Sequence, residues 1–321
     1  MSMGTVCSLK KRLGRTRYAR PRDVCVFGFC RTNRDASRIY LQRSFMRHTA
    51  ILAILFLLAM QPFIAQSLDQ TGGTKIPLHP YAGKLRTVET VVGGKRRSFL
   101  FDTGGGMTLI TPEVAKEIGC TPTGRLTAFR MDGTQIHFLR CGLMDFNFSG
   151  VRVSVETAVF DLMALLPKDF PPLAGIISLH TFQAQPFTVN LGENELILES
   201  PNSLKTRIKS MKLLQMRIGH QAAGATVDAF VATKIGQDIA WFEIDSGNLD
   251  PVLIAPHLAE KLSISETGVQ NLSFEIFGLP PLDEPALRKD LIYDGVLNAH
   301  LLERLALTFD IPNNRLWGKV R

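Results

Sequence analysis

Two stretches of the chain carry the same short motif, and this duplication constrains the fold more than any other feature of the sequence. FLFDTGGGMTLI (99–110) and WFEIDSGNLDPVLI (241–254) each run from apolar residues into an Asp, a hydroxyl residue and a Gly. A further Gly lies nine positions before each Asp, at Gly93 and Gly236. Because Gly suits the turn between two strands, each motif is predicted to follow the second strand of a hairpin.

A second pair of segments, starting at Gly175 and Gly295, aligns without gaps. Counted from each Gly, His recurs at position +5, Thr at +13 (Thr188 and Thr308), Asn or Asp at +15, Asn at +19 and Leu at +21. Each segment is typical of a short strand, a short helical turn and a hairpin with an Asn-containing bend. The sequence therefore contains two copies of one unit.

The two units define the expected domains. We predict a first lobe over residues 68–203 and a second over residues 204–321, separated by the polar connector ESPNSLKTR. Strand-like stretches dominate both units and the helical patterns are short, so the predicted class is all-β, mainly strands with short helices.

The residues before the first unit have a different composition. Residues 1–67 carry twelve Lys and Arg against two Asp and Glu, whereas the remainder carries 25 against 27. The body is therefore close to neutral, which argues against a nucleic-acid partner. Residues 1–45 are a basic leader or a mis-assigned start.

Residues 46–67 are typical of a signal peptide, with a short apolar run and a cleavage pattern at Ala65-Gln66-Ser67. The run is short for a membrane span. We expect an exported protein, periplasmic or secreted, that contacts the membrane only transiently through this segment. It would stay membrane-anchored if the signal were not cleaved.

The duplicated Asp residues suggest a chemistry. If the two units pack about a pseudo-twofold axis, Asp102 and Asp245 meet there, and two adjacent carboxylates share one proton. One can then take a proton from water while the other gives one to a carbonyl oxygen, which is general acid–base hydrolysis of an amide. A single such turn would be an ordinary structural turn. The neighbouring residues expected to support the pair are Thr103, Gly104, Ser246 and Gly247.

At these residues the sequence resembles the aspartic peptidases. The matching elements are the two Asp-Thr/Ser-Gly turns and, later in each unit, LAGIIS and YDGVLN, which resemble the family's Gly-containing strands. The resemblance spans most of residues 85–321, and each unit is similar to a retropepsin-like subunit, fused in tandem. It implies a bilobal fold with a cleft between the lobes, one Asp from each lobe activating water, and a peptide bound as an extended strand.

Three departures from the family pattern stand out. Ser178 and Asn298 occupy positions where the family often has a second Gly. No tyrosine lies in the expected flap of the first unit. Asp250 follows the second turn, where small residues are usual, and its charge is expected to raise the pKa of the Asp pair.

A flap is nevertheless expected in the stretch FRMDGTQIHF. Its centre, Met131, Asp132 and Gly133, is typical of a hairpin, and Asp-Gly suits a tight primed turn. The hairpin is either a cover for the substrate or a plain surface hairpin.

Cys120 and Cys141 are the only cysteines of the body, and they either form a disulfide or stay as two buried thiols. The repeat-equivalent His180 and His300 have no accompanying metal-ligand spacing, so we interpret them as packing or solvent-facing residues. No cofactor or metal is expected.

The sequence thus predicts an exported aspartic endopeptidase that acts as a monomer, because one chain supplies both halves of the site. Its expected partner is a peptide or an unfolded protein segment. Two alternatives stay open: a catalytically silent protein of the same fold that binds a peptide or partner, and a structural, dimerising envelope protein.

Overall fold

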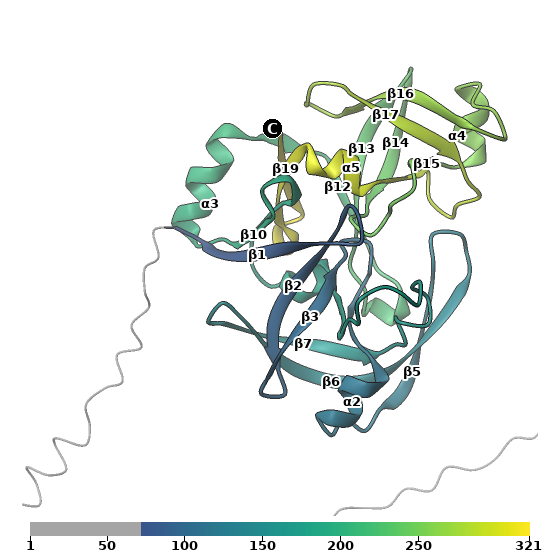
Figure 1. Cartoon of the computed structure of the whole chain (residues 1–321). Helices are drawn as coiled ribbons and strands as arrows, with labels where there is room; N and C mark the ends of the chain where they lie inside the picture. Colours follow the sequence, from purple (N-terminus) through teal and green to yellow (C-terminus); the bar gives the residue numbers. More distant parts are fainter. Residues whose placement is uncertain (1–71) are drawn as a thin grey trace, which may run out of the picture. The chain divides into compact units, whose positions relative to one another are not determined.

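The computed structural model describes residues 72–321, which are coloured in Figure 1. The predicted leader (1–45) and signal peptide (46–67) lie outside the described residues. Strands dominate, and the helices are short, so the predicted mainly β class is confirmed. Within residues 72–321, no helix combines the length and apolarity that crossing a membrane requires.

The N-terminal lobe is built on strands in the order β2-β3-β8-β4-β7-β6-β5. The pairs β3–β8 and β4–β7 are parallel and the other neighbours are antiparallel. The strand bounds are β2 Leu85–Val92, β3 Lys95–Phe101, β4 Thr108–Ile110, β5 Thr123–Phe129, β6 Gln135–Phe148, β7 Val151–Val159 and β8 Gly175–Ile177.

The C-terminal lobe repeats this topology. Its strand order is β12-β13-β14-β18-β15-β17-β16, and its parallel pairs, β14–β18 and β15–β17, are the counterparts of those in the first lobe. The duplication in the sequence is therefore a duplication of the fold. The bounds are β12 Met216–Gly219, β13 Asp228–Ile235, β14 Asp238–Ile244, β15 Val252–Ile254, β16 Val269–Ile276, β17 Leu282–Arg288 and β18 Gly295–Leu297.

Six further strands, here called the interlobe sheet, run in the order β11-β20-β19-β9-β10-β1. The two repeated hairpins, β9–β10 and β19–β20, meet there through an antiparallel pairing of β9 with β19. Their bounds are β1 Thr74–Tyr81, β9 Phe187–Asn190, β10 Glu195–Leu198, β11 Lys212–Leu214, β19 Leu305–Asp310 and β20 Arg315–Val320.

The repeat-equivalent residues Thr188 and Thr308 lie directly opposite each other in the interlobe sheet, with their hydroxyl oxygens 2.8 Å apart. The preceding and following phenylalanines, Phe187 and Phe309, stack with ring centroids 5.2 Å apart. Because equivalent residues face each other in an antiparallel pair, the pseudo-twofold axis that relates the lobes passes between these two threonines.

The helices are α2 Pro112–Glu117, α3 Pro201–Arg207, α4 Pro256–Lys261 and α5 Ala299–Glu303. Single 3-10 turns lie at η1 Leu179–Phe182, η2 Leu191–Glu193, η3 Ile208–Ser210, η4 Ala222–Gly224 and η5 Ile311–Asn313. The prolines at the first position of α2, α3 and α4 are favourable there, since that position needs no backbone N–H. The predicted domain boundary at residues 203 and 204 falls within α3.

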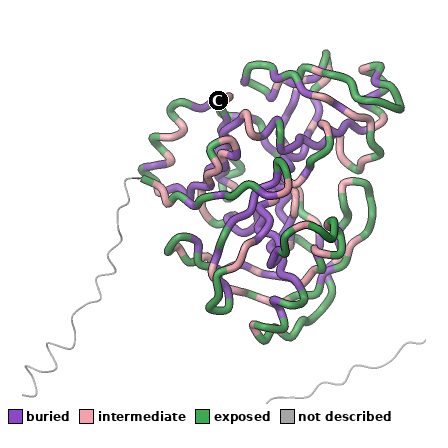
Figure 2. Tube along the Cα trace, viewed as in Figure 1, coloured by how far each residue is buried: buried purple, intermediate pink, exposed green. Residues whose placement is uncertain are grey.

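The core continues from one lobe to the other. Figure 2 shows the buried segments gathered in the interior, and the strands on either side contribute a run of phenylalanines. Ring contacts link Phe146 to Phe148, Phe148 to Phe182, Phe182 to Phe187 and Phe187 to Phe309. This shared apolar core holds the ends of β3 and β14 in place, and both motif aspartates follow those ends.

Candidate active site

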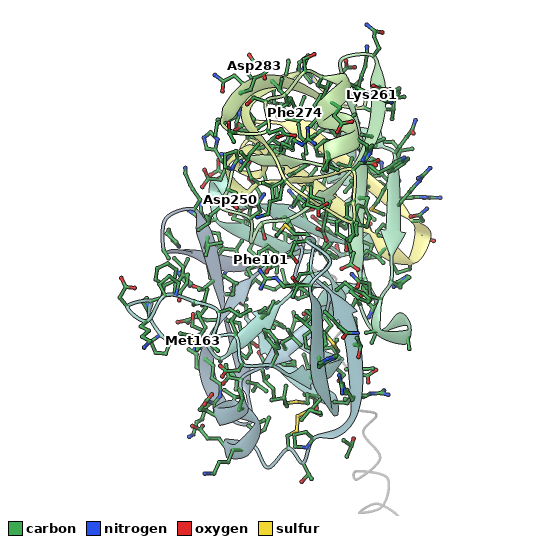
Figure 3. All side chains as sticks on the ribbon, turned by 90° about the vertical axis from the view of Figure 1, so that its right-hand side faces the viewer. Phe101, Met163, Asp250, Lys261, Phe274 and Asp283 are labelled. Atoms are coloured by element: carbon green, nitrogen blue, oxygen red, sulfur yellow. A yellow bond between two sulfur atoms is a disulfide. The ribbon has the colours of Figure 1, made fainter. Side chains whose placement is uncertain are left out.

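The two motif turns bind each other through their hydroxyl residues. The backbone N–H of Thr103 donates to Ser246 Oγ at 3.0 Å, and the backbone N–H of Ser246 donates to Thr103 Oγ1 at 2.9 Å. Each hydroxyl also donates to a backbone carbonyl of the opposite strand, Thr103 to Ile244 at 2.6 Å and Ser246 to Phe101 at 3.2 Å. Figure 3 labels Phe101, which ends β3 in the middle of the molecule. The four bonds lock the turns together across the pseudo-twofold axis.

These hydrogen bonds bring Asp102 and Asp245 close together. The short distance between the two turns explains why each carries a glycine. A Cβ atom at Gly104 would lie 2.5 Å from Asp245 Cγ, and one at Gly247 would lie 2.7 Å from Asp102 Cγ. Any side chain at either glycine would therefore push the carboxyls apart. The same glycines hold the carboxyls, because the N–H of Gly104 donates to Asp102 Oδ1 at 3.0 Å and that of Gly247 to Asp245 Oδ1 at 2.7 Å.

Burial raises the pKa of both carboxyls. The pKa of Asp245 lies well above its usual value because burial, the charge of Asp102 and the hydrogen bond that it shares with Asp102 all favour the protonated form. Hydrogen bonds from Asp245 and from nearby backbone N–H groups oppose the burial effect on the pKa of Asp102. Two carboxyls held this close share one proton at the pH where only one of them ionises, and the proton belongs to the pair rather than to either residue.

The pair opens onto a cavity of about 340 Å³ lined by residues of both lobes. This volume is within the range that binds small ligands and short peptide segments. On the side of the N-terminal lobe the lining is mostly apolar and includes Leu85, Leu100, Phe138, Phe160, Leu162 and Ile176.

The hairpin between β5 and β6, here called the flap (Phe129–Gln135), contributes Phe129, Arg130 and Met131 to the cavity lining. It touches the C-terminal lobe: the N–H of Ile292 donates to the carbonyl of Met131 at 2.9 Å. The side chain of Gln221 accepts from the N–H of Phe129 at 2.8 Å and donates to its carbonyl at 3.3 Å. The structure thus has the flap bonded to the opposite lobe at the mouth of the cavity.

The turn at the tip of the flap differs from the expected primed turn. The N–H of Gly133 donates to the carbonyl of Arg130, and Gly133 has φ +79°, whereas Met131 and Asp132 have negative φ. A primed turn needs a positive φ at a central residue, so this turn is a type I turn followed by a left-handed Gly. The Asp132 side chain accepts from the N–H of Thr134 and so favours that choice.

Besides Asp245, five polar residues of the C-terminal lobe line the cavity and were not anticipated: Gln221, Thr226, Asp228, Glu243 and Tyr293. Glu243 could have been found, because it lies two residues before Asp245 and a strand places alternate residues on one face. Asp228 could not, because the register between β13 and β14 brings it there. Burial raises the pKa of Asp228 to about 6. Burial, followed by the charges of Asp245 and Asp228, raises the pKa of Glu243 well above its usual value.

Asp250 does not reach the pair. Figure 3 labels it on the C-terminal lobe, where it is exposed and outside the cavity lining. Its backbone bonds to Asn248 and Asn298, which fixes the turn after the second motif. The acidic neighbour whose charge raises the pKa of Asp245 is therefore Asp102 rather than Asp250.

The residues at the second-Gly positions are buried. Asn298 caps α5 by accepting from the N–H of Leu301 at 2.8 Å, and Ser178 precedes η1. His180 is buried in η1, where burial lowers its pKa to about 4, and it faces the Thr108 hydroxyl at 3.3 Å. His300 is exposed and bonds to Glu284 at 2.8 Å.

Of the two arrangements left open for the cysteines, the structure has the disulfide between Cys120 and Cys141, drawn in yellow in Figure 3. It ties the end of α2 to β6, one strand of the flap hairpin. In the part of the chain that the structure describes, no three His, Cys, Asp or Glu side chains are arranged to hold a metal ion.

Comparisons with known proteins support the fold and point to a family. Residues 88–180 match the family model described as aspartyl protease. The fold is similar to that of an aspartic proteinase from Irpex lacteus, with a TM-score of 0.50 and 14% identity over 78% of this chain and 97% of that one. It is also similar to EDGP, with a TM-score of 0.50 and 10% identity over 77% and 94% of the two chains. No curated protein matches the chain.

Proposed function

We propose that this chain, an aspartic peptidase clan member by its family match and its bilobal fold, hydrolyses peptide bonds with a water activated by Asp102 and Asp245. One observation carries the proposal: a half-buried Asp102 and a buried Asp245, one from each lobe, lie at the same cavity, each against the glycine of the opposite turn.

The geometry supports a division of roles. Asp102 takes a proton from a water while that water attacks the carbonyl carbon of the substrate, and Asp245 gives its proton to the carbonyl oxygen. The resulting tetrahedral diol breaks down when the proton on Asp102 passes to the leaving nitrogen. A hydroxyl proton of the diol then returns to Asp245. The pair ends in its starting state, and no covalent intermediate forms.

The substrate we propose is an extended peptide or an unfolded protein segment lying between the flap and the pair. The flap offers strand edges, and a peptide can add to such an edge through its backbone. Because the chain supplies both aspartates and closes the flap on its own second lobe, we propose that it acts as a monomer.

We also propose export. The motif of residues 46–67 supports it, and so does the disulfide between Cys120 and Cys141, since disulfides persist in oxidising compartments.

The test is cleavage of a mixed peptide library from pH 3 to pH 8 by the purified chain, with Asp102→Asn and Asp245→Asn beside it. We expect the parent to cut and both variants to lose cleavage while keeping the thermal unfolding midpoint of a folded protein. A folded parent that retains peptides on a column without cutting any would contradict the proposal and indicate a binding protein.

A further inference from the structure

The two lobes present different residues at equivalent positions beside the aspartates. Leu100 lies two residues before Asp102 on β3, and Glu243 lies two residues before Asp245 on β14. The pseudo-twofold axis relates these two positions. Where the N-terminal lobe offers the cavity a leucine, the C-terminal lobe offers a carboxyl.

The neighbouring strands show the same difference, with an apolar residue in the N-terminal lobe and an acidic residue in the C-terminal lobe. Leu100 pairs with Thr87 on β2, and Glu243 pairs with Phe230 on β13. Two residues before those partners lie Leu85 and Asp228, the first residues of their strands, and both line the cavity. The cavity therefore has an apolar side built on Leu85 and Leu100 and an acidic side built on Asp228 and Glu243.

The carboxyl of Glu243 has no partner. Glu243 is 4% exposed, and no described residue within 72–321 gives its carboxyl a hydrogen bond or an ion pair. Two strand residues span about 7 Å, and alternate side chains share a face, so this carboxyl lies close to the aspartate pair on the cavity side. A buried carboxyl without a partner is costly, and an incoming cation removes that cost.

Asp228 is a second buried carboxyl that an incoming cation would stabilise. It is 4% exposed, accepts from the Thr226 hydroxyl at 3.1 Å, and has no cation paired to it among the described residues. Among residues 72–321, no basic side chain forms an ion pair with Asp228 or Glu243, although the charge of His220 lowers the pKa of Asp228. The guanidinium of Arg217 stacks on Trp241 at 3.8 Å. Arg130, on the flap, also lines the cavity, but its side chain is exposed and forms no described ion pair with Asp228 or Glu243.

Resting on the proposed peptidase function, we propose that Asp228 and Glu243 form a subsite for a cationic side chain, Lys or Arg, at one of the two substrate residues that flank the scissile bond. Leu85 and Leu100 form the apolar subsite on the other side. The cleft thus selects peptides with one basic and one apolar residue around the cut, because an apolar side chain would leave both carboxyls buried and unpaired.

The experiment uses the purified chain and a matched peptide series. One cleaved sequence is made with Lys, Arg, Gln, norleucine or Glu at each position flanking the cut, and kcat/KM is measured for each. At one position we expect Lys and Arg to exceed norleucine on the order of 100-fold, and Glu to be the poorest. At the other position norleucine should exceed Lys.

Two variants test the assignment. Glu243→Gln keeps the shape and removes the charge, and should reduce the preference for Lys over norleucine to a few-fold while the norleucine peptide is still cut. Glu243→Leu copies the residue at the equivalent position, Leu100, and should reverse the preference. Asp250→Asn, an exposed acidic residue near the second turn, is the matched control and should leave the preference unchanged.

The outcomes separate the two proposals. Cleavage with equal rates for Lys and norleucine at both positions overturns the subsite and leaves the peptidase function standing. If the parent cuts nothing, the same peptides are titrated for binding. Tighter binding of the Lys peptide that is lost in Glu243→Gln supports the subsite without the peptidase, and equal affinities overturn it.

Discussion

Thr103 and Ser246 hold the two lobes in register: the backbone N–H of each donates to the side-chain oxygen of the other, at 3.0 and 2.9 Å. Both residues are buried, 1% and 2% exposed. Their bonds fix the turns from which Asp102 and Asp245 project, so the position of the pair depends on contacts made by neither carboxyl.

Replacing Thr103 by Val should therefore separate the lobes at this point. The change removes the acceptor for the N–H of Ser246 and the donor to the carbonyl of Ile244. Each buried backbone group left unpaired costs about 1–3 kcal/mol. We expect a lower free energy of unfolding in urea and a loss of cleavage of tenfold or more. Thr103→Ser keeps the hydroxyl and should behave as the parent; a Val variant as stable as the Ser variant would refute this role.

The stability of the protein should depend on Asp228 in a defined pH window. Its folded pKa of about 6 lies above the usual 3.8, so its stabilising contribution is complete below pH 3.8 and is lost as the pH rises through 6. The loss amounts to about 3 kcal/mol. The side chain in Asp228→Asn cannot ionise. The free energy of unfolding of this variant should therefore rise relative to that of the parent between those pH values.

Urea unfolding at pH 4, 5, 6 and 7 measures this difference. The advantage of Asp228→Asn should grow up to about pH 6 and then stay constant. A difference that is independent of pH would mean that Asp228 is not held protonated by its surroundings.

The disulfide should stabilise the lobe that carries the flap. Cys120 and Cys141 are 21 residues apart in the sequence, and closing a loop of this size is worth about 2–4 kcal/mol. A double Cys→Ser variant should unfold at correspondingly lower urea. The parent in a strong reductant should match the variant, and a parent whose unfolding midpoint ignores the reductant would show that the bridge does not carry this stability.

The flap should loosen when its hold on the second lobe is cut. Gln221→Leu removes both side-chain bonds to the backbone of Phe129. We expect faster amide hydrogen exchange across Arg130–Thr134 and a higher KM for peptides. Gln215→Leu changes an exposed glutamine outside the cavity and should alter neither. Unchanged exchange in Gln221→Leu would show that other contacts hold the flap.

Particular residues show which features of the fold and of the candidate site could be predicted from the sequence. The equivalence of Thr188 and Thr308, read from spacing alone, turns out to mark the pseudo-twofold axis, because a duplicated unit related by twofold symmetry must bring some equivalent residues face to face. Gly104 and Gly247 were expected to support the pair, and the clash of a Cβ atom at either position with the opposite aspartate gives that expectation its physical reason.

What the sequence could not supply depends on register and side-chain direction. Asp228 lies 17 residues before Asp245 and reaches the cavity only because β13 pairs with β14 in one particular register. Asp250 is only five residues after Asp245 in the sequence. Its side chain is nevertheless exposed, because hydrogen bonds to Asn248 and Asn298 fix the turn that carries it. Distance along the chain is a poor guide wherever a strand pairing intervenes.

The most direct test of the account is a double-mutant cycle on the two aspartates. For one cleaved peptide, kcat/KM is measured for the parent, Asp102→Asn, Asp245→Asn and the double variant. Because the pair acts as one unit that shares a proton, each single change should reduce kcat/KM to the same floor as the double change. Losses that simply add, or a single variant that keeps most of the parent's activity, would contradict the shared-proton mechanism.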